Sequence, residues 1–354
     1  KAIKKRKGTA KKTDKPDFDD STTEDSIISD NSETIQFPYS LKWSLSQHLD
    51  CIRCAAFHST LPYIATGSDD GTIRLTNLDP PKRPKAKKSS PVQLLSLRGH
   101  YGAVLSLAAH QNLLISGDVT GQICVWDFLE TKSTLSDSHG RVDHHINYMN
   151  NDHKDAVWSI AAHSDVPYFI SASADKTIRI HDFQTHTSEP ISIEDCPSSV
   201  IFNSDGSMFI VGCTNGKIRI FSDKKEIEMM DINSRVISLC SGSSKDQIFV
   251  SCEDRNIHLV DLNSKEIIKS FIAHEGFTSA MILLPENDFL ITTSSDKTIR
   301  VWKADTFDVV LADNYHREKY GEAGLCLAST PSTNSYKFFA SGGADGMIKI
   351  FGKK

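Results

Sequence analysis

The stretch SDKTIRVWK at residues 295–303 shares five consecutive residues, DKTIR, with ADKTIRIHD at residues 174–182. PYIATGSDDGTIRLTN at residues 62–77 has the same design, with an Asp-Gly pair between two short β-branched runs. An Asp-Gly pair supplies the positive φ angles of a two-residue hairpin turn whose twist matches that of the strands. The repeated stretch is therefore predicted to be a β-hairpin.

The hairpin turn recurs along the chain from about residue 38. Its position falls at Asp70, Thr120, Asp175, Asn215, Asp254, Asp296 and Asp345. The intervals are 50, 55, 40, 39, 42 and 49 residues, and they bracket the roughly 40–45 residues of a four-stranded propeller blade once loop insertions are allowed. We therefore predict an all-β, seven-bladed propeller in which the two DKTIR copies mark the same place in blades three and six.

A second set of positions repeats with the turns. A His lies 22 residues before the turn Asp at His48, His153 and His274, and 20 residues before Thr120 at His100. A Ser or Thr lies four residues before the turn at Thr66, Ser116, Ser171, Thr292 and Ser341. These positions resemble the WD-repeat signature, in which a loop His, a strand Ser or Thr, a turn Asp and a strand Trp form one buried hydrogen-bonded network per blade.

The Trp position of this signature, six residues after the turn, varies between blades. It reads Thr76, Trp126, His181, Phe221, Val260, Trp302 and Phe351. We therefore expect only blade six to hold the complete network, formed by His274, Thr292, Asp296 and Trp302. The other blades are expected to depend more on apolar packing.

The two ends of the propeller are predicted to meet. YSLKWSLSQH at 39–48 is similar to the expected fourth strand VQLLSLRGH at 92–100, so an N-terminal strand is predicted to complete the last blade and remove the open edge of the ring. Residues 1–15 carry eight Lys and Arg, and residues 16–35 carry seven Asp and Glu. We predict a disordered basic-then-acidic linker over 1–37 and the propeller over 38–354. The KKRK run at 4–7 is either a solvated charge run or a nuclear-import or polyanion-binding patch.

Composition excludes several classes of protein. The 354-residue sequence has a formal net charge of −5, which gives no global attraction to nucleic acid. No stretch approaches the roughly 18 apolar residues of a membrane span, and the N-terminus lacks a signal-peptide core. Eight cysteines at irregular positions indicate a reduced compartment without disulfides. We expect a cytoplasmic protein with peripheral endomembrane association through partners or a nuclear fraction, and, since the sequence starts at Lys1, a further part upstream.

Motifs for catalysis or cofactors are not recognised in the sequence. Cys51 and Cys54 with His48 have metal-like spacing, but a strand places positions 51 and 54 on opposite faces, and no second Cys pair completes a site. The His/Ser/Asp sets recur in blade after blade, which indicates a structural device and not a catalytic triad. We therefore predict no enzyme activity, no cofactor and no metal.

Two insertions leave alternatives open. HGRVDHHINYMNNDH at 139–153 gathers His139, His144, His145 and His153, which are either solvated side chains or a transition-metal or pH-sensitive contact. The loop at 80–91 has five Lys and Arg within 82–88. It is either solvated or binds an acidic protein surface or anionic lipid.

Five stretches are similar to the C-terminal propeller of the striatin family. They lie at 48–78, 82–88, 152–182, 235–261 and 342–351. The runs IRCAAFH, DAVW and EDRNIH within them are more particular than generic WD signatures. The similarity covers roughly 40–354, and blade four and 303–335 depart most from the family.

This resemblance implies a non-catalytic regulatory and scaffolding subunit of protein phosphatase 2A. The implied partners are the phosphatase scaffold and catalytic subunits, germinal-centre-type kinases, a Mob-like protein and membrane-associated proteins. Family members carry an upstream coiled coil, and because no heptad pattern exists in 1–40, we expect oligomerisation only through a region outside this sequence.

Partner contacts are predicted on the propeller face built from the loops before the first strands and the turns between second and third strands. The candidate residues are Asp69, Tyr101, Asp155, Glu253, Arg255, Glu275 and Tyr320. The alternative function is that of a WD-repeat substrate receptor or peptide reader in a ubiquitin-ligase or chromatin complex.

Overall fold

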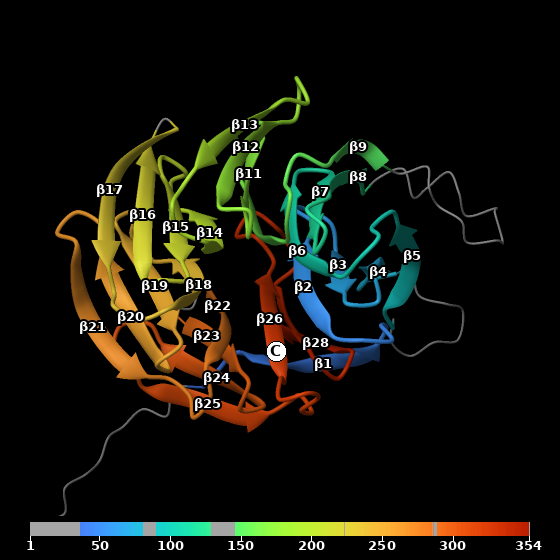
Figure 1. Ribbon diagram of the computed structural model, residues 1–354. Coiled ribbons are helices and arrows are strands. Elements are labelled where there is room, and N and C mark those ends of the chain that lie inside the picture. The colour runs from blue at the N-terminus through green and yellow to red at the C-terminus, as the bar shows by residue number, and fades with distance from the viewer. Residues whose placement is uncertain are drawn as a thin grey trace, which may run out of the picture. The chain divides into compact units, whose positions relative to one another are not determined.

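The structure is a computed structural model that describes residues 36–80, 90–128, 146–222, 224–284, 286 and 289–353. Three expectations lie outside these residues: the charged segment over 1–35, the basic run at 82–88, and the histidines at 139, 144 and 145. The described part of the chain contains seven four-stranded antiparallel sheets (Figure 1), which confirms the prediction of an all-β propeller with seven blades.

The blades are numbered in chain order, and their strands are given from the innermost outward. Blade one holds β2 (Ile52–Phe57), β3 (Tyr63–Ser68), β4 (Thr72–Asn77) and β5 (Val92–Arg98). Blade two holds β6 (Val104–His110), β7 (Leu113–Asp118), β8 (Ile123–Asp127) and β9 (Ile146–Asn150). Blade three holds β10 (Val157–Ala162), β11 (Tyr168–Ser173), β12 (Thr177–Asp182) and β13 (Ser188–Ser192). Blade four holds β14 (Pro197–Phe202), β15 (Phe209–Cys213), β16 (Lys217–Ser222) and β17 (Lys225–Asp231).

The remaining blades follow the same plan. Blade five holds β18 (Val236–Ser241), β19 (Gln247–Cys252), β20 (Asn256–Asp261) and β21 (Glu266–Ile272). Blade six holds β22 (Thr278–Leu284), β23 (Phe289–Ser294), β24 (Thr298–Lys303) and β25 (Val309–Asn314). Blade seven holds β26 (Gly324–Ser329), β27 (Phe338–Gly343), β28 (Met347–Lys353) and, from the other end of the sequence, β1 (Tyr39–Ser46). Each first strand contacts the first strand of the next blade, and β26 contacts β2, so the blades form a ring.

The ring closes through its first and last strands. β1 pairs antiparallel with β28, from Tyr39 opposite Lys353 to Ser46 opposite Met347 (Figure 1). This is the pairing expected from the sequence. Phe37, which was expected in the linker, is buried with Tyr39 in a cluster that joins blades six and seven. The ordered propeller therefore begins earlier in the chain than residue 38.

Burial falls from the middle of each blade towards its outer edge. Every residue of β15 and β23 is buried, whereas six of the seven residues of β21 are exposed. The inner strands are covered on both faces by neighbouring blades. Leu75 of blade one, for example, shares a core cluster with Val104 and Leu114 of blade two. This two-sided burial explains why the second strands are almost continuous apolar runs and do not alternate.

The first strand of every blade carries a β-bulge directly after its first residue. The bulged residues are Arg53, Leu105, Trp158, Ser198, Ile237, Ser279 and Leu325. A bulge bends its strand and redirects the extra side chain. Because these strands are the innermost of their sheets, the bulges form a ring around the central axis.

Candidate functional site

One backbone hydrogen bond in each blade joins the loop before the first strand to the turn between the second and third strands. In blade one the Asp69 N–H donates to the Cys51 carbonyl at 3.0 Å, and in blade five the Glu253 N–H donates to the Arg235 carbonyl at 2.9 Å. The same bond is present in the other five blades. Both kinds of loop therefore lie at the same end of the ring, which we call the turn-side face.

Side-chain networks hold these loops in place, and blade six contains all four predicted members. His274 Nδ1 lies 3.0 Å from Asp296 Oδ2, and His274 Nε2 lies 2.8 Å from Thr292 Oγ1. The Trp302 indole N–H donates to the same Thr292 hydroxyl at 2.9 Å. The structure thus joins the loop, two strands and the turn through one hydrogen-bonded chain.

Blade one has a shorter version of this chain. His48 lies 3.0 Å from the Asp70 carboxylate and 2.9 Å from the Thr66 hydroxyl. At the Trp position, Thr76 accepts a hydrogen bond from the Gln47 amide at 2.6 Å.

Blade three replaces the Trp by a second histidine. His153 lies 3.0 Å from Asp175 and 2.7 Å from Ser171, and His181 Nε2 lies 2.8 Å from the same Ser171 hydroxyl. His181 Nδ1 is buried without a hydrogen-bond partner in the described residues. Burial, together with the neighbouring His153 and Arg179, lowers the pKa of His181 to about 3.

In blade two, the acidic member of the network lies at a different position from the one expected from the sequence. The carboxylate that meets His100 belongs to Asp118, 3.0 Å away, and not to the turn position Thr120. Thr120 donates to Asp118 through its N–H at 2.8 Å and its hydroxyl at 2.7 Å. Ser116 lies 2.6 Å from His100 and accepts from the Trp126 indole at 2.7 Å. The expectation that only blade six is complete was therefore wrong.

Blade seven contains a network member that the sequence did not reveal. His316 lies 3.1 Å from Asp345 and 2.8 Å from Ser341. His316 precedes its Asp by 29 residues, while His48, His153 and His274 precede theirs by 22, because the loop and hairpin around β26 are longer. The signal was present in the correctly spaced pair Ser341 and Asp345.

In blades one and three, the surroundings favour a neutral His beside an ionised Asp. Burial lowers the pKa of His48 and of His153, although the neighbouring Asp opposes this. Burial alone raises the pKa of Asp175, but hydrogen bonds from Thr177, the Lys154 amide and His153 outweigh it and bring the value to about 2. The five histidines are buried or nearly so. No network residue is placed as an accessible nucleophile, which agrees with a structural role.

The seven predicted contact residues all lie on the turn-side face. Tyr101 and Tyr320 are 90 % and 87 % exposed, and Asp155, Glu253, Arg255 and Glu275 are exposed as well. Asp69 is half-buried because its carboxylate accepts two hydrogen bonds from Arg53 Nε, at 2.9 and 3.0 Å. The structure therefore groups these residues on one surface but gives them different freedom to bind.

The sequence did not point to three exposed or charged residues of this face. Trp158, at the bulge of β10, is 48 % exposed, and Leu49 is 88 % exposed. Arg53, at the bulge of β2, also forms an ion pair with Glu322 at 2.8 Å, which ties blade one to the loop before blade seven. A Trp directly after the start of a first strand was the available signal, but its exposure depends on the bulge.

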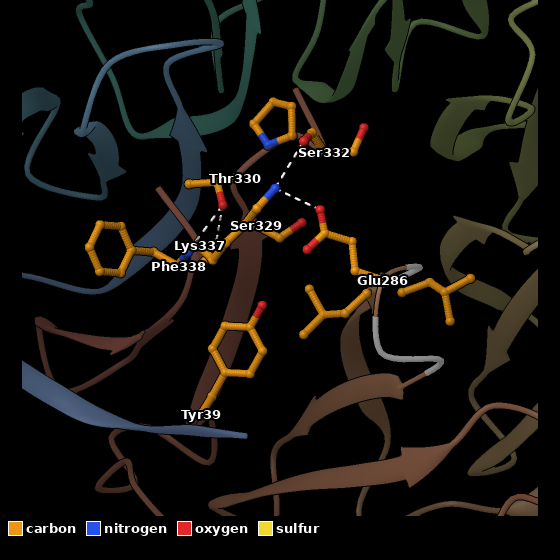
Figure 2. A pocket seen from close by; sticks show the side chains of 10 residues that line it. Tyr39, Glu286, Ser329, Thr330, Ser332, Lys337 and Phe338 are labelled. Atoms are coloured by element: carbon orange, nitrogen blue, oxygen red, sulfur yellow. Dashed lines mark hydrogen bonds and ion pairs between the residues drawn. The ribbon is translucent and has the colours of Figure 1, made fainter. Parts of the chain in front are cut away.

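A pocket lies at the opposite end of the ring, between blades six and seven (Figure 2). Tyr39, Leu283 and Phe338 supply apolar lining, and Lys337 Nζ forms an ion pair with Glu286 at 2.6 Å. The lysine also donates to the Ser332 carbonyl at 2.9 Å. Its charge is therefore already compensated, and the described lining of the pocket offers no free charged group for a ligand.

In the structure, His48 and Cys54, two of the three residues with metal-like spacing, contact other groups. Both ring nitrogens of His48 are engaged by Asp70 and Thr66. Cys54 Sγ lies 3.5 Å from the Val104 carbonyl of the next blade.

No helix within the described residues has the length and hydrophobicity needed to span a membrane.

Comparison with known proteins agrees with this geometry. The family model described as WD domain, G-beta repeat matches residues 39–77, 91–127, 146–182, 183–222 and 265–303. The solved WD40 β-propeller domain of Doa1 superposes with a TM-score of 0.73, covering 89 % of this chain and 97 % of that one, at 18 % sequence identity. This likeness concerns the fold alone.

Within the WD-repeat proteins, the chain is similar to several striatins. Mouse striatin is 28 % identical over 92 % of this chain, human striatin-4 is 26 % identical over 92 %, and a Dictyostelium discoideum striatin homolog is 25 % identical over 94 %. The chain spans only 43–45 % of the length of these relatives. The chain belongs to the WD-repeat family. Within that family it is similar to the striatins over almost its whole length, which confirms the resemblance drawn from its motifs.

Proposed function

We propose that this chain is a protein-interaction scaffold whose turn-side face binds partner proteins. The observation that carries the proposal is the presence of exposed aromatic side chains, Tyr101, Trp158 and Tyr320, on loops and bulges of a rigid ring. Aromatic residues dominate the binding energy of many protein interfaces. Fixed loops lose little conformational entropy on binding, which favours affinity.

The proposal assigns no catalytic step to the chain. His, Ser or Thr, and Asp occur together in five blades, and their buried positions serve to hold loops. A catalytic centre needs one accessible nucleophile beside its base.

By similarity to the striatins, the scaffold is proposed to act as a regulatory subunit of protein phosphatase 2A in the cytoplasm, with a peripheral endomembrane or nuclear fraction. It would recruit germinal-centre-type kinases and a Mob-like protein through its faces. The similarity along 92 % of the chain to mouse striatin supports this assignment.

Affinity purification of the full-length protein from cells, followed by mass spectrometry, tests the proposal. We expect phosphatase, kinase and Mob-like subunits, and we expect at least one of them to be lost when Tyr101, Trp158 and Tyr320 are all changed to Ala. Ile268→Ala is the matched control, because Ile268 is 51 % exposed on the outer strand β21. A partner set without phosphatase or kinase would contradict the striatin-type assignment. Equal partner binding by the triple Ala variant and by Ile268→Ala would contradict the proposal that the turn-side face binds partners.

Exposed Trp158 beside the central axis favours one other candidate, a receptor for a short peptide at the mouth of the ring. This alternative predicts ubiquitin-ligase or chromatin subunits in the same purification. It also predicts that Trp158→Ala alone abolishes binding.

A further inference from the structure

Blade five differs from blades one, three and six at two of three equivalent positions. Blades one, three and six have Ser, Asp and Arg at the end of the second strand, in the turn and in the third strand. These residues are Ser68, Asp70 and Arg74; Ser173, Asp175 and Arg179; and Ser294, Asp296 and Arg300. Blade five has Cys252, Asp254 and His258 instead. Both changes replace a residue that rarely binds transition metals by one that commonly does.

The three side chains of blade five converge. The Cys252 sulfur, an Asp254 carboxylate oxygen and a ring nitrogen of His258 all lie within 4.8 Å of one another. Cys252 is fully buried and His258 is 7 % exposed, whereas Asp254 is exposed. The group is thus enclosed on the protein side and open at the turn-side face.

His258 has one ring nitrogen held by a hydrogen bond and the other without a partner among the described residues. Its Nδ1 lies 2.7 Å from the Ser270 hydroxyl of β21, and its Nε2 is buried with no hydrogen-bond partner in the described residues. A metal-binding His usually has one ring nitrogen held by such a partner, which leaves the lone pair of the other nitrogen free to coordinate. An unpaired buried nitrogen otherwise costs free energy.

Asp254 is also available to a cation. Its two carboxylate oxygens accept hydrogen bonds from the Asn256 N–H at 3.0 Å and the Asn256 side-chain amide at 2.9 Å. No Lys or Arg pairs with it among the described residues. A second convergent group, Asp50, Cys51 and Asp69, differs in this respect, since Lys319 pairs with Asp50 at 2.6 Å and Arg53 with Asp69 at 2.8 Å.

We propose that Cys252, Asp254 and His258 form a binding site for a divalent transition metal, with Zn²⁺ favoured by the combination of thiolate, carboxylate and imidazole. Three protein ligands leave the fourth position of a tetrahedral site for water or for a side chain of a bound partner. The metal would join the turn to the strands of blade five, a blade without the His network that does this elsewhere. Binding releases the thiol proton of Cys252 to solvent, because the thiolate is the ligand.

Titration of the chelator-treated chain tests the site. We expect one Zn²⁺ per chain by calorimetry at this site, and we expect Co²⁺ to give the charge-transfer absorption of a cobalt–thiolate bond. Cys252→Ser and His258→Arg install the residues that blades one, three and six have at the same positions, so the fold should tolerate them. Each should weaken Zn²⁺ binding at least tenfold, and Cys252→Ser should remove the cobalt–thiolate band.

Two further variants separate this site from other metal-binding groups. Ser270→Ala removes only the group that orients His258 and should weaken binding by about 10- to 100-fold. Cys51→Ser should leave both the affinity and the band unchanged. Any zinc binding by the histidines at 139–145 would produce no thiolate band. A chain that gives no cobalt–thiolate band, or a Cys252→Ser variant that retains it, would overturn the proposal.

Discussion

The carboxylate of Asp118 lies 3.0 Å from His100 Nδ1, although Asp118 ends a strand and the corresponding carboxylates of four other blades belong to turns. The turn residue Thr120 binds Asp118 and not the histidine. Blade two therefore keeps the network geometry while moving its acidic residue two positions along the chain.

This arrangement predicts unequal effects of two neighbouring substitutions. Asp118→Ala should lower the free energy of unfolding by about 1–3 kcal/mol, because it leaves His100 and the amides of Thr120 and Gln122 without their acceptor. Thr120→Ala removes only one hydroxyl donor and should cost less. Chemical denaturation of both variants measures the difference, and a larger loss for Thr120→Ala would contradict the assignment.

Blades six and four provide a second comparison. Asp296→Ala should reduce the melting temperature more than Asn215→Ala, since Asp296 accepts hydrogen bonds from His274, the Glu275 amide and Thr298. Asn215 is exposed, and its side-chain amide donates to Asp195 and accepts a long hydrogen bond from the Lys217 N–H at 3.3 Å. Calorimetric melting at neutral pH checks the order, and equal losses would count against a structural role for the network.

His181 should make blade three sensitive to acid. Its pKa falls from the ordinary 6.5 to about 3 on folding, so the unfolded chain binds the proton more tightly. Its contribution to stability is therefore complete above pH 6.5 and is lost as the pH falls from 6.5 towards 3. At pH 5.5 the loss should be about 1 kcal/mol.

His181→Phe should remove this loss. Blades four and seven already have Phe at this position, stacked on a partner Phe with ring centroids 4.7 and 4.4 Å apart, and His181 stacks on Phe169 in the same way at 4.4 Å. The variant should gain stability over the wild type between pH 6.5 and 5. Phe221→His in blade four is the reciprocal control and should create a new loss in acid. Denaturation curves that stay parallel over this pH range would exclude the effect.

Removal of residues 34–47 should give insoluble protein. The deletion exposes the edge of β28 and removes Phe37 and Tyr39 from the cluster between blades six and seven, and an unpaired strand edge promotes aggregation. Removal of residues 1–33 is the control and should leave the propeller soluble. The soluble fraction after expression and size-exclusion chromatography measures both.

The number of blades and their closure could be predicted from the sequence because turn residues and apolar runs are local signals. The role of Asp118 could not be predicted from the sequence. A carboxylate can reach the same His nitrogen from two positions, and only the folded turn selects one. His316 was hidden by an unusually long spacing. The sequence marks Trp158 only as part of the DAVW run, and its exposure follows from a bulge that depends on pairing with β11. Cys252, Asp254 and His258 match no familiar metal motif, and it is their convergence in space that indicates a site.

The pairing of β1 with β28 also constrains the order of events during synthesis. β1 ends at Ser46 and β28 begins at Met347, so the first strand leaves the ribosome long before its partner exists. At roughly 5–20 residues per second the wait is about 15–60 seconds. Until then the incomplete propeller has an unpaired first strand, and a chaperone that shields this strand would act in that interval.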